Sequence, residues 1–353
     1  MRRARWFTYV ALLAMFPAAA RAWDRGQVQT FAVLPAGATG PEGLEVDASG
    51  NVYVATFGFT ANGPVTGEGQ LFVFDRQGHL LRRVAVAGSS PNLLGLHLRA
   101  STGKLLVADF GNAQVLEVDP VNGSATVFMT LPPLPHPGGS SLNDITEDRA
   151  GNVYVSDSFQ GIVWKTGPQG GVATAFVDDP LLRTVGVPPF GANGVRFNGG
   201  ETALFIANTG NDTVVKVPVS AGVAGTPAVL TNSINGADGI EIDADDNLWV
   251  VANQADEIVV IDPTGKVIAK LGDFGGAIKD GSPVQLLFPA SLRFRGNSLL
   301  VTNLSLDLRL VNPAFVSVDS AWCAQVTRYT VSKLPARIPG LNRGEKGEKD
   351  ERD

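Results

Sequence analysis

One short pattern recurs six times along this 353-residue chain and constrains what it can fold into. In each copy a polar or small residue begins an apolar, strand-like run, and a second such run follows after a short turn. Self-similarity at a fixed period of 45 to 52 residues is typical of an array of identical small sheets. If the array closes into a ring, equivalent positions on the innermost strands meet at its axis. The six copies begin at Glu42, Leu94, Asn143, Asn193, Asp238 and Ala290.

Each copy has the composition of four short strands joined by turns. The runs are rich in Val, Ile and aromatic residues and are bounded by Gly, Asp, Asn and Pro. Outside the N-terminal segment no window shows sustained helical periodicity. Six copies of four strands predict an all-β fold, a six-bladed β-propeller with four antiparallel strands per blade.

The ends of the array predict how the ring closes. The last copy offers strands near Leu292 and Leu299 and a third at 325–329, but no fourth strand follows. The segment 28–33, just before the first copy, resembles the missing strand. We therefore expect an N-terminal strand to pair into the last blade, which would protect an otherwise open edge.

The two termini differ from the repeated region. Residues 1–22 combine three early arginines, an apolar stretch and the small-x-small motif Ala20-Arg21-Ala22, which predicts a secretory signal peptide. The propeller is expected over 23–333 and a disordered charged tail over 334–353. The expected location is therefore secreted or periplasmic. Cys323 is the single cysteine and is interpreted as a small buried hydrophobe.

The charge balance limits the class of partner. The N-terminal segment holds four arginines and no acidic residue, so 24 basic and 34 acidic residues remain and the net charge is near −10. An acidic chain is poorly suited to nucleic acid or an anionic membrane surface. No later segment reads as a membrane span. A cation and a small molecule are the expected ligands.

Four of the repeated positions carry oxygen-bearing side chains: Glu42, Asn143, Asn193 and Asp238. Two carboxylates and two amides form an all-oxygen donor set, which favours a divalent cation, above all Ca²⁺, over zinc or copper. The alternative is that Asn-Gly and Asp-Gly only form turns. That alternative explains Glu42 poorly, and Leu94 and Ala290 show that the fold does not require a polar residue here.

A second polar position falls at the end of each second strand. Its uniformity favours a structural cap on the following turn, with orientation of the metal ligands as the alternative. Asp144, which follows Asn143, stands where most copies have Gly; it is either a satisfied turn carboxylate or a contact to Asn143 or substrate. The second polar position comprises Thr56, Asp109, Asp157, Asn208, Asn253 and Asn303.

These residues resemble the SMP-30/gluconolactonase/LRE-like superfamily of six-bladed propellers, and the blades are similar to NHL repeats. The resemblance implies a divalent cation held by Glu42, Asn143, Asn193 and Asp238, with Asp238 as the catalytic residue. One position departs from the gluconolactonase pattern. Ser141 stands where those enzymes carry a sugar-contacting Arg, so the resemblance does not extend to a sugar-acid lactone as substrate.

Two functions from different classes follow. The first is a secreted calcium-dependent hydrolase of the lactonase or esterase type, acting on a small lactone or ester at a metal site in the central channel. The second is a non-catalytic, NHL-like binding propeller with a structural calcium and a protein partner on its loop face.

Overall fold

The computed structural model describes residues 25–338, and the regular secondary structure of these residues is almost entirely β-strand. The predicted signal peptide and residues 339–353 of the predicted tail lie outside the described residues. No helix within 25–338 is long and apolar enough to cross a membrane. The helical elements are α1 (Ser320–Cys323) and the 3-10 turns η1 (Pro180–Leu182), η2 (Asn253–Ala255) and η3 (Leu308–Leu310).

The first sheet after the N-terminal strand is an antiparallel meander in the order β2-β3-β6-β7. A two-stranded hairpin, β4-β5, branches from it between β3 and β6. The bounds are β2 (Gly40–Val46), β3 (Val52–Phe57), β4 (Phe59–Thr60), β5 (Gly63–Pro64), β6 (Gln70–Phe74) and β7 (Leu80–Ala85).

The next two meanders are joined edge to edge into an eight-stranded sheet by a parallel pair, β11 with β15. The first comprises β8 (Leu93–Leu98), β9 (Leu105–Asp109), β10 (Gln114–Val118) and β11 (Ala125–Thr130). The second comprises β12 (Leu142–Glu147), β13 (Val153–Asp157), β14 (Ile162–Gly167) and β15 (Gly170–Asp178).

Two further meanders follow in the chain. One comprises β16 (Ala192–Phe197), β17 (Ala203–Asn208), β18 (Thr213–Ser220), β19 (Val223–Ala224) and β20 (Ala228–Thr231). The other comprises β21 (Ala237–Ile242), β22 (Leu248–Ala252), β23 (Glu257–Ile261) and β24 (Val267–Leu271). A small hairpin, β25 (Ile278–Lys279) with β26 (Ser282–Pro283), then leads to the last sheet.

The last sheet joins the two ends of the chain, in the order β1-β29-β28-β27. β1 pairs antiparallel with β29, as the segment 28–33 predicts, and Thr30 faces Ser332. Its strands are β1 (Gln29–Val33), β27 (Pro289–Arg295), β28 (Ser298–Asn303) and β29 (Thr330–Pro335).

Two details of this last sheet differ from the sequence prediction. The third strand is Thr330–Pro335 and not 325–329, because the backbone of 325–328 is bonded elsewhere. Gln325 and Val326 donate to the preceding helical turn, and Thr327 and Arg328 donate to the carbonyl of Gly281. The ordered fold also passes the boundary expected at residue 333. Leu334 lies within β29, and Ile338 is buried against the same core.

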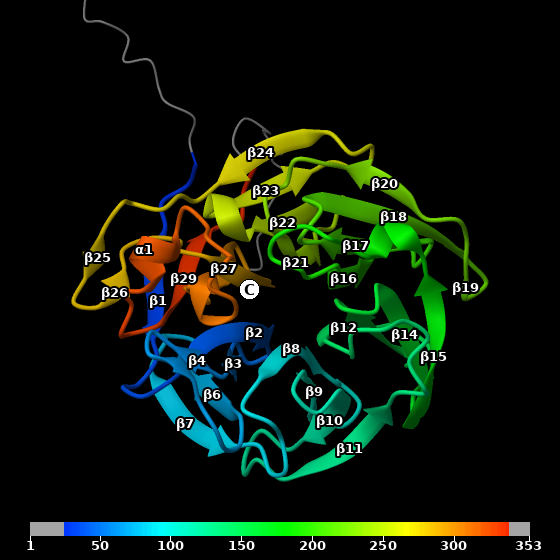
Figure 1. Cartoon of the computed structure of the whole chain (residues 1–353), viewed down its shortest axis with the longest axis horizontal. Helices are drawn as coiled ribbons and strands as arrows, with labels where there is room; N and C mark the ends of the chain where they lie inside the picture. Colours follow the sequence, from blue (N-terminus) through cyan, green and yellow to red (C-terminus); the bar gives the residue numbers. More distant parts are fainter. Residues whose placement is uncertain (1–24, 339–353) are drawn as a thin grey trace, which may run out of the picture.

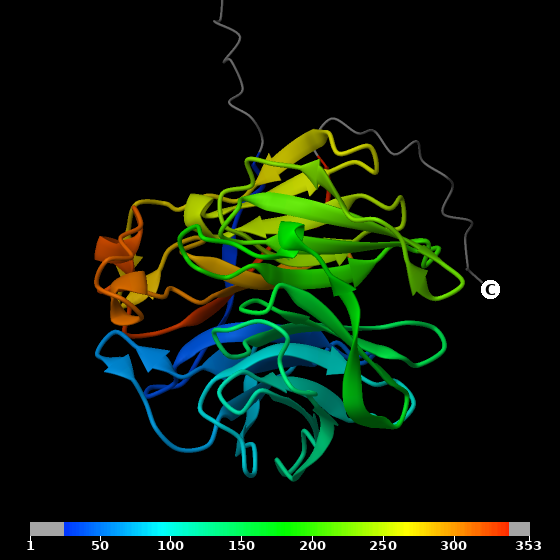
Figure 2. The same ribbon diagram turned by 45° about the vertical axis from the view of Figure 1, so that its right-hand side comes forward.

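The sheets are arranged in a ring, which confirms an all-β, propeller-like fold (Figure 1). The first strand of each meander lies nearest the centre, and each such strand contacts the next around the circle. Figure 2, turned by 45°, shows the sheets side by side around this circle. The innermost strands are β2, β8, β12, β16, β21 and β27.

The burial of the strands follows their place in each sheet. A middle strand such as β22, with the sequence Leu-Trp-Val-Val-Ala, is buried along its whole length because neighbouring sheets cover both of its faces. The outer strand β7, Leu-Leu-Arg-Arg-Val-Ala, has no wholly buried residue. The core therefore consists of apolar layers between adjacent sheets, as the continuous apolar runs in the sequence predict.

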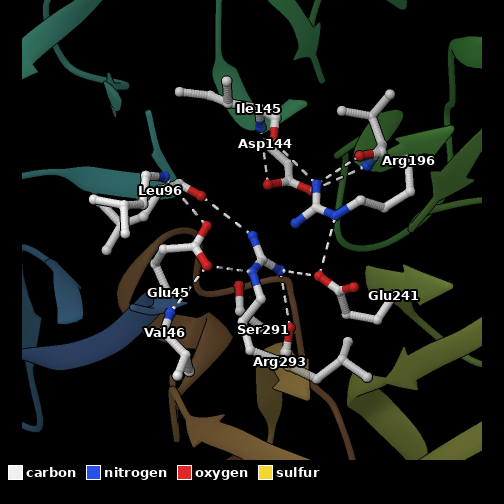
Figure 3. A network of polar contacts seen from close by, with 12 residues as sticks. Glu45, Val46, Leu96, Asp144, Ile145, Arg196, Glu241, Ser291 and Arg293 are labelled. Carbon is white, nitrogen blue, oxygen red and sulfur yellow. Dashed lines mark hydrogen bonds and ion pairs between the residues drawn. The ribbon is translucent and has the colours of Figure 1, made fainter. Parts of the chain in front are cut away.

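An ionic network ties the innermost strands together near the axis (Figure 3). The guanidinium of Arg293 on β27 contacts Glu241 on β21 at 2.9 Å and Glu45 on β2 at 3.5 Å, and it donates to the carbonyl of Leu96 on β8 at 3.2 Å. Arg196 on β16 continues the network to Glu241 at 3.2 Å.

The same Arg196 reaches Asp144 on β12 at 2.8 Å, so every innermost strand contributes a group to the network. Burial by itself would lower the pKa of Arg293, but the carboxylates of Glu45 and Glu241 raise it well above its usual value. The network is therefore a set of buried and half-buried charges that compensate one another across the ring.

Removing one member of the network should destabilise the fold strongly. Arg293→Ala leaves Glu45 without its cationic partner and Glu241 with Arg196 alone, and we expect a loss of about 3–5 kcal/mol in the free energy of unfolding. The matched control is Lys104→Ala, which breaks the half-exposed pair with Glu117 and should cost about 1 kcal/mol or less. Urea unfolding measures both, and equal small losses would contradict this role for Arg293.

Candidate metal centre and active site

Each innermost strand carries a β-bulge at the repeated position. In β2 the register with β3 shifts between Pro41 and Leu44, which leaves Glu42 and Gly43 outside the regular pairing. A bulge bends a strand and redirects a side chain, and bulges are common beside active sites. The bulged strands thus direct their polar residues to one place. The equivalent shifts enclose Leu94, Asn143, Asn193, Asp238 and Ala290 in the other five strands.

The glycine after the repeated position is required by the close approach of neighbouring strands. A Cβ on Gly43 would lie 2.1 Å from the carbonyl oxygen of Leu94, and one on Gly194 would lie 2.3 Å from that of Asp238. Both glycines lie inside strands, not in turns. The X-Gly dipeptides therefore reflect packing at the hub, and turn formation does not account for them.

The four candidate ligands line one cavity of about 40 Å³. This volume accommodates about three water-sized positions. Thr209 and Asn253 also line it. Within the described residues, no three His, Cys, Asp or Glu side chains gather in a way that would hold a metal. A cation in this cavity would therefore depend on the amide oxygens of Asn143 and Asn193 as well as on the two carboxylates.

Glu42 is the least compensated acid in the cavity. It is buried, and its Oε2 has no hydrogen-bond partner within residues 25–338. Burial raises the pKa of Glu42 well above its usual value, Asp238 and Asp144 raise it further, and only Arg293 acts in the opposite direction. A buried carboxylate without a donor is costly, and a cation would compensate it.

Asp238 shares this environment but is partly compensated. Burial raises its pKa to about 7, and the charge of Asp144 acts in the same direction. A hydrogen bond from Asn253 acts in the opposite direction and lowers the pKa. The Asn253 amide donates to Oδ2 of Asp238 at 2.9 Å. Asp238 is therefore an acid whose ionisation falls near neutral pH when no cation is bound.

The two asparagine ligands are oriented by hydroxyl groups. The amide nitrogen of Asn193 donates to Thr209 at 2.9 Å, and Thr209 in turn donates to the carbonyl of Ala237 at 2.7 Å. Asn143 donates to Ser158 at 3.3 Å in the same way. These contacts hold each amide by its nitrogen, so its Oδ1 is the atom left to meet a cation.

Ser158 and Thr209 were not singled out from the sequence. The signal that would have found them is their position: each directly follows a member of the second polar position, Asp157 or Asn208. A short polar residue there lies beside the bulge of its own sheet, where it reaches the ligand.

Three members of the second polar position cap the following turn, as the first interpretation predicts. Asp109 accepts from the backbone of Asn112, Asp157 from that of Gln160 at 3.2 Å, and Asn208 from that of Asn211 at 3.1 Å. Asn253 is the exception, because its amide holds Asp238 while its Oδ1 has no partner within the described residues. Both roles proposed for this position thus occur.

Asp144 belongs to the ionic network and is not among the residues that line the cavity. Its Oδ2 accepts from the backbone of Val195 at 3.0 Å and pairs with Arg196. Its charge still acts on the cavity, since it raises the pKa of both Glu42 and Asp238. Asp144 therefore links the structural network to the candidate site.

The wall above the polar floor is apolar. Leu304, Leu306 and Leu308 line it from one segment, and every residue from 304 to 308 is buried. Among the residues that line the cavity there is no Lys, Arg, His, Tyr or Trp. The remaining wall residues are Phe57, Leu94, Pro188, Phe190 and Phe288.

The segment 304–329 continues from this wall, and Figures 1 and 2 show it beside the hairpin β4-β5. It is fixed to the neighbouring sheet by a buried carboxyl pair, Asp256 and Asp319. Burial and the proximity of Asp319 raise the pKa of Asp256 to about 8, and burial raises that of Asp319 to about 6. Asp256 also accepts from the backbone of Phe288, at 2.7 Å, so the pair supports the cavity wall.

Comparison with protein families identifies the chain. The model of the SMP-30/Gluconolactonase/LRE-like region matches residues 87–272, just over half of the sequence. The chain belongs to this family. The resemblance carried by the repeated residues is thereby confirmed. No curated protein is similar enough to count as a match.

Solved structures share the fold of this family member at low sequence identity. A luciferin-regenerating enzyme is 18% identical, with a TM-score of 0.61 over 90% of this chain and 96% of the other. A calcium-binding protein, regucalcin, from Agrobacterium tumefaciens is 19% identical, with a TM-score of 0.59 over 85% and 92%. A gluconolactonase from Xanthomonas campestris is 14% identical, with a TM-score of 0.58 over 88% and 89%.

The Asp256–Asp319 pair should make stability depend on pH in a defined direction. A carboxyl whose pKa is raised in the folded state stabilises the fold fully below its unfolded value, about 4, and that contribution is lost as pH rises through about 8. We expect the stability of wild type to fall across this window in chelator, and the fall to be smaller in Asp256→Asn. The exposed Asp280→Asn variant is the control, and an unchanged slope in Asp256→Asn would refute the assignment.

Proposed function

We propose that this chain is a secreted, six-bladed propeller that acts as a calcium-dependent hydrolase of the lactonase or esterase type. The observation that carries the proposal is the cavity itself: two buried carboxylates and two oriented amides form a polar floor beneath an apolar wall. The six innermost strands that contact one another in a circle support the blade count. The basic, apolar N-terminal sequence supports secretion.

The donor set fits a hard divalent cation. Glu42, Asn143, Asn193 and Asp238 would hold it, and calcium accepts about six to eight oxygens in irregular geometry, so water or substrate would complete its coordination. The unpartnered Oε2 of Glu42 supports this assignment because a bound cation would supply the missing compensation. The description of the structural neighbour regucalcin as calcium-binding agrees with the choice of ion.

Each residue of the cavity would have its own role in the hydrolysis. A bound cation would polarise a carbonyl oxygen and stabilise the charge that develops on it. Asp238, to which Asn253 and Asn193 donate hydrogen bonds, would accept a proton from the attacking water or attack directly. Thr209 and Ser158 would keep the amides of Asn193 and Asn143 in position, and the apolar wall would exclude bulk water.

A sugar-acid lactone is not the substrate we propose. Ser141, which stands where the gluconolactonases carry an Arg, is fully buried and does not line the cavity. Its backbone is held by Asp157. The side chain of Ser141 therefore does not take the role of that Arg.

Calcium binding should depend on Glu42 and on pH. We expect calorimetry to detect one calcium in the wild-type protein and none in Glu42→Gln, while the exposed Glu68→Gln control binds as wild type. Affinity should weaken as pH falls through about 7, because a proton on Asp238 competes with the ion. Unaltered binding in Glu42→Gln would remove the proposed site.

Hydrolysis should require both the ion and Asp238. A panel of lactones, aryl esters and phosphotriesters, assayed with and without chelator, should show turnover that chelator abolishes. Asp238→Asn should lower kcat about 100-fold or more, in line with the loss of a positioned acid–base group. Chelator-insensitive turnover, or full activity in Asp238→Asn, would contradict the mechanism. Calcium binding without turnover of any substrate would instead identify a non-catalytic binding propeller.

A further inference from the structure

Five phenylalanines form a continuous aromatic arc at the cavity mouth. Phe59 stacks on Phe57 at 4.9 Å between ring centroids, and Phe57 meets Phe110 edge-on at 5.6 Å. Phe110 meets Phe159 at 5.8 Å, and Phe159 stacks on Phe190 at 5.6 Å. These rings come from segments that are far apart in the sequence.

The arc is continuous with the cavity and reaches solvent. Phe57 and Phe190, on either side of Phe110, line the cavity, whereas Phe159 is 37% exposed. Val185 and Val187, in the loop before Phe190, are also exposed. An exposed apolar surface that joins a polar cavity marks a ligand-binding surface more often than a random patch does.

The size of the cavity limits how much of a substrate it can hold. A volume of about 40 Å³ holds only the reacting group of a substrate together with an ion. The remainder of the molecule must lie outside the polar floor, where the aromatic arc and the leucines of 304–308 are the adjacent surfaces. The arc therefore faces the part of the substrate that does not react.

The hydrogen-bond donors of the cavity side chains are already engaged. Thr209 donates to a backbone carbonyl, and the amide nitrogens of Asn193 and Asn253 are held by protein partners. With no Lys, Arg, His, Tyr or Trp in the lining, the hydroxyl oxygens of a polyol would find no further donor, and the acceptors without a partner among the described residues are Oε2 of Glu42 and Oδ1 of Asn253. A polyhydroxylated molecule would therefore leave most of its hydroxyl groups without partners in this cavity.

We propose that the substrate is an uncharged ester or lactone with an apolar aryl or alkyl group that lies against this aromatic arc. This inference rests on the proposed hydrolase function and adds the class of substrate to it. The ester carbonyl would lie at the polar floor and the apolar group across Phe190 and Phe159. Hydrophobic contact and aromatic stacking would supply the binding energy.

The test measures how binding and turnover depend on the apolar group. For a series of straight-chain alkyl lactones, kcat/KM should rise about fourfold for each methylene that the arc covers. Unreactive lactams of the same chain lengths should show the same trend in Kd by calorimetry. Gluconolactone should be turned over at least 100-fold less efficiently than the best alkyl lactone.

Two variants locate the effect. Phe159→Ser removes an exposed ring of the arc and should flatten the dependence on chain length, and Phe190→Ala should flatten it further. Val172→Ser is the matched control, because Val172 is 67% exposed on β15 and takes no part in the arc. Thermal unfolding of all three checks that the fold is intact.

The outcomes separate the two proposals. Lactam binding that depends on chain length and on Phe159, without any hydrolysis, would support the apolar ligand and refute the hydrolase. Hydrolysis of gluconolactone as efficient as that of alkyl lactones, or a chain-length dependence unchanged in Phe159→Ser and Phe190→Ala, would refute the apolar substrate while leaving the hydrolase standing. Absence of any lactam binding would also refute the apolar substrate.

Discussion

The close approach of the innermost strands at the hub is the constraint on which the rest of the structure depends. Neighbouring backbones come so near that a Cβ on Gly43 or Gly194 would collide with a carbonyl oxygen of the next strand. Strands packed this tightly leave little room for side chains at the axis, so those that point there must be compensated. The chain meets this requirement in two ways, with a network of opposite charges in one part of the hub and with a set of oxygen donors in another.

The two sets differ in how their charge is balanced. In the network, the guanidinium groups of Arg196 and Arg293 lie between the carboxylates of Glu45, Asp144 and Glu241. In the cavity, Glu42 and Asp238 have no cationic side chain within salt-bridge distance among the described residues, and both have a raised pKa. Buried charges of like sign are stable only with a proton or a cation. The first set therefore links the innermost strands, and the second is left without a salt bridge to any cationic side chain of the described residues.

The surroundings of the two cavity carboxylates are mostly apolar. The wall is apolar, and the segment 304–329 that forms part of it is held by a buried carboxyl pair, Asp256 and Asp319. Water is limited to a few positions beside the polar floor, which would strengthen electrostatic interactions with the carbonyl of the proposed substrate. The aromatic arc extends the wall to the surface. In the function proposed above, the polar floor would hold the ion and the apolar surface would hold the rest of the substrate.

The sequence alone determined the repeat, the all-β class, the pairing of the N-terminal strand with the last sheet, and four polar positions that line one cavity. These were predictable because a period of about 50 residues places equivalent positions at equivalent heights in every sheet. The tertiary structure alone decided the contacts between sheets: the bulges, the hydroxyls of Ser158 and Thr209, the Arg293 network and the aromatic arc. It also shows the last strand at Thr330–Pro335, whereas the sequence predicts it at 325–329. Such contacts join residues that no local pattern relates, because their distance depends on how the ring closes and not on their separation along the chain.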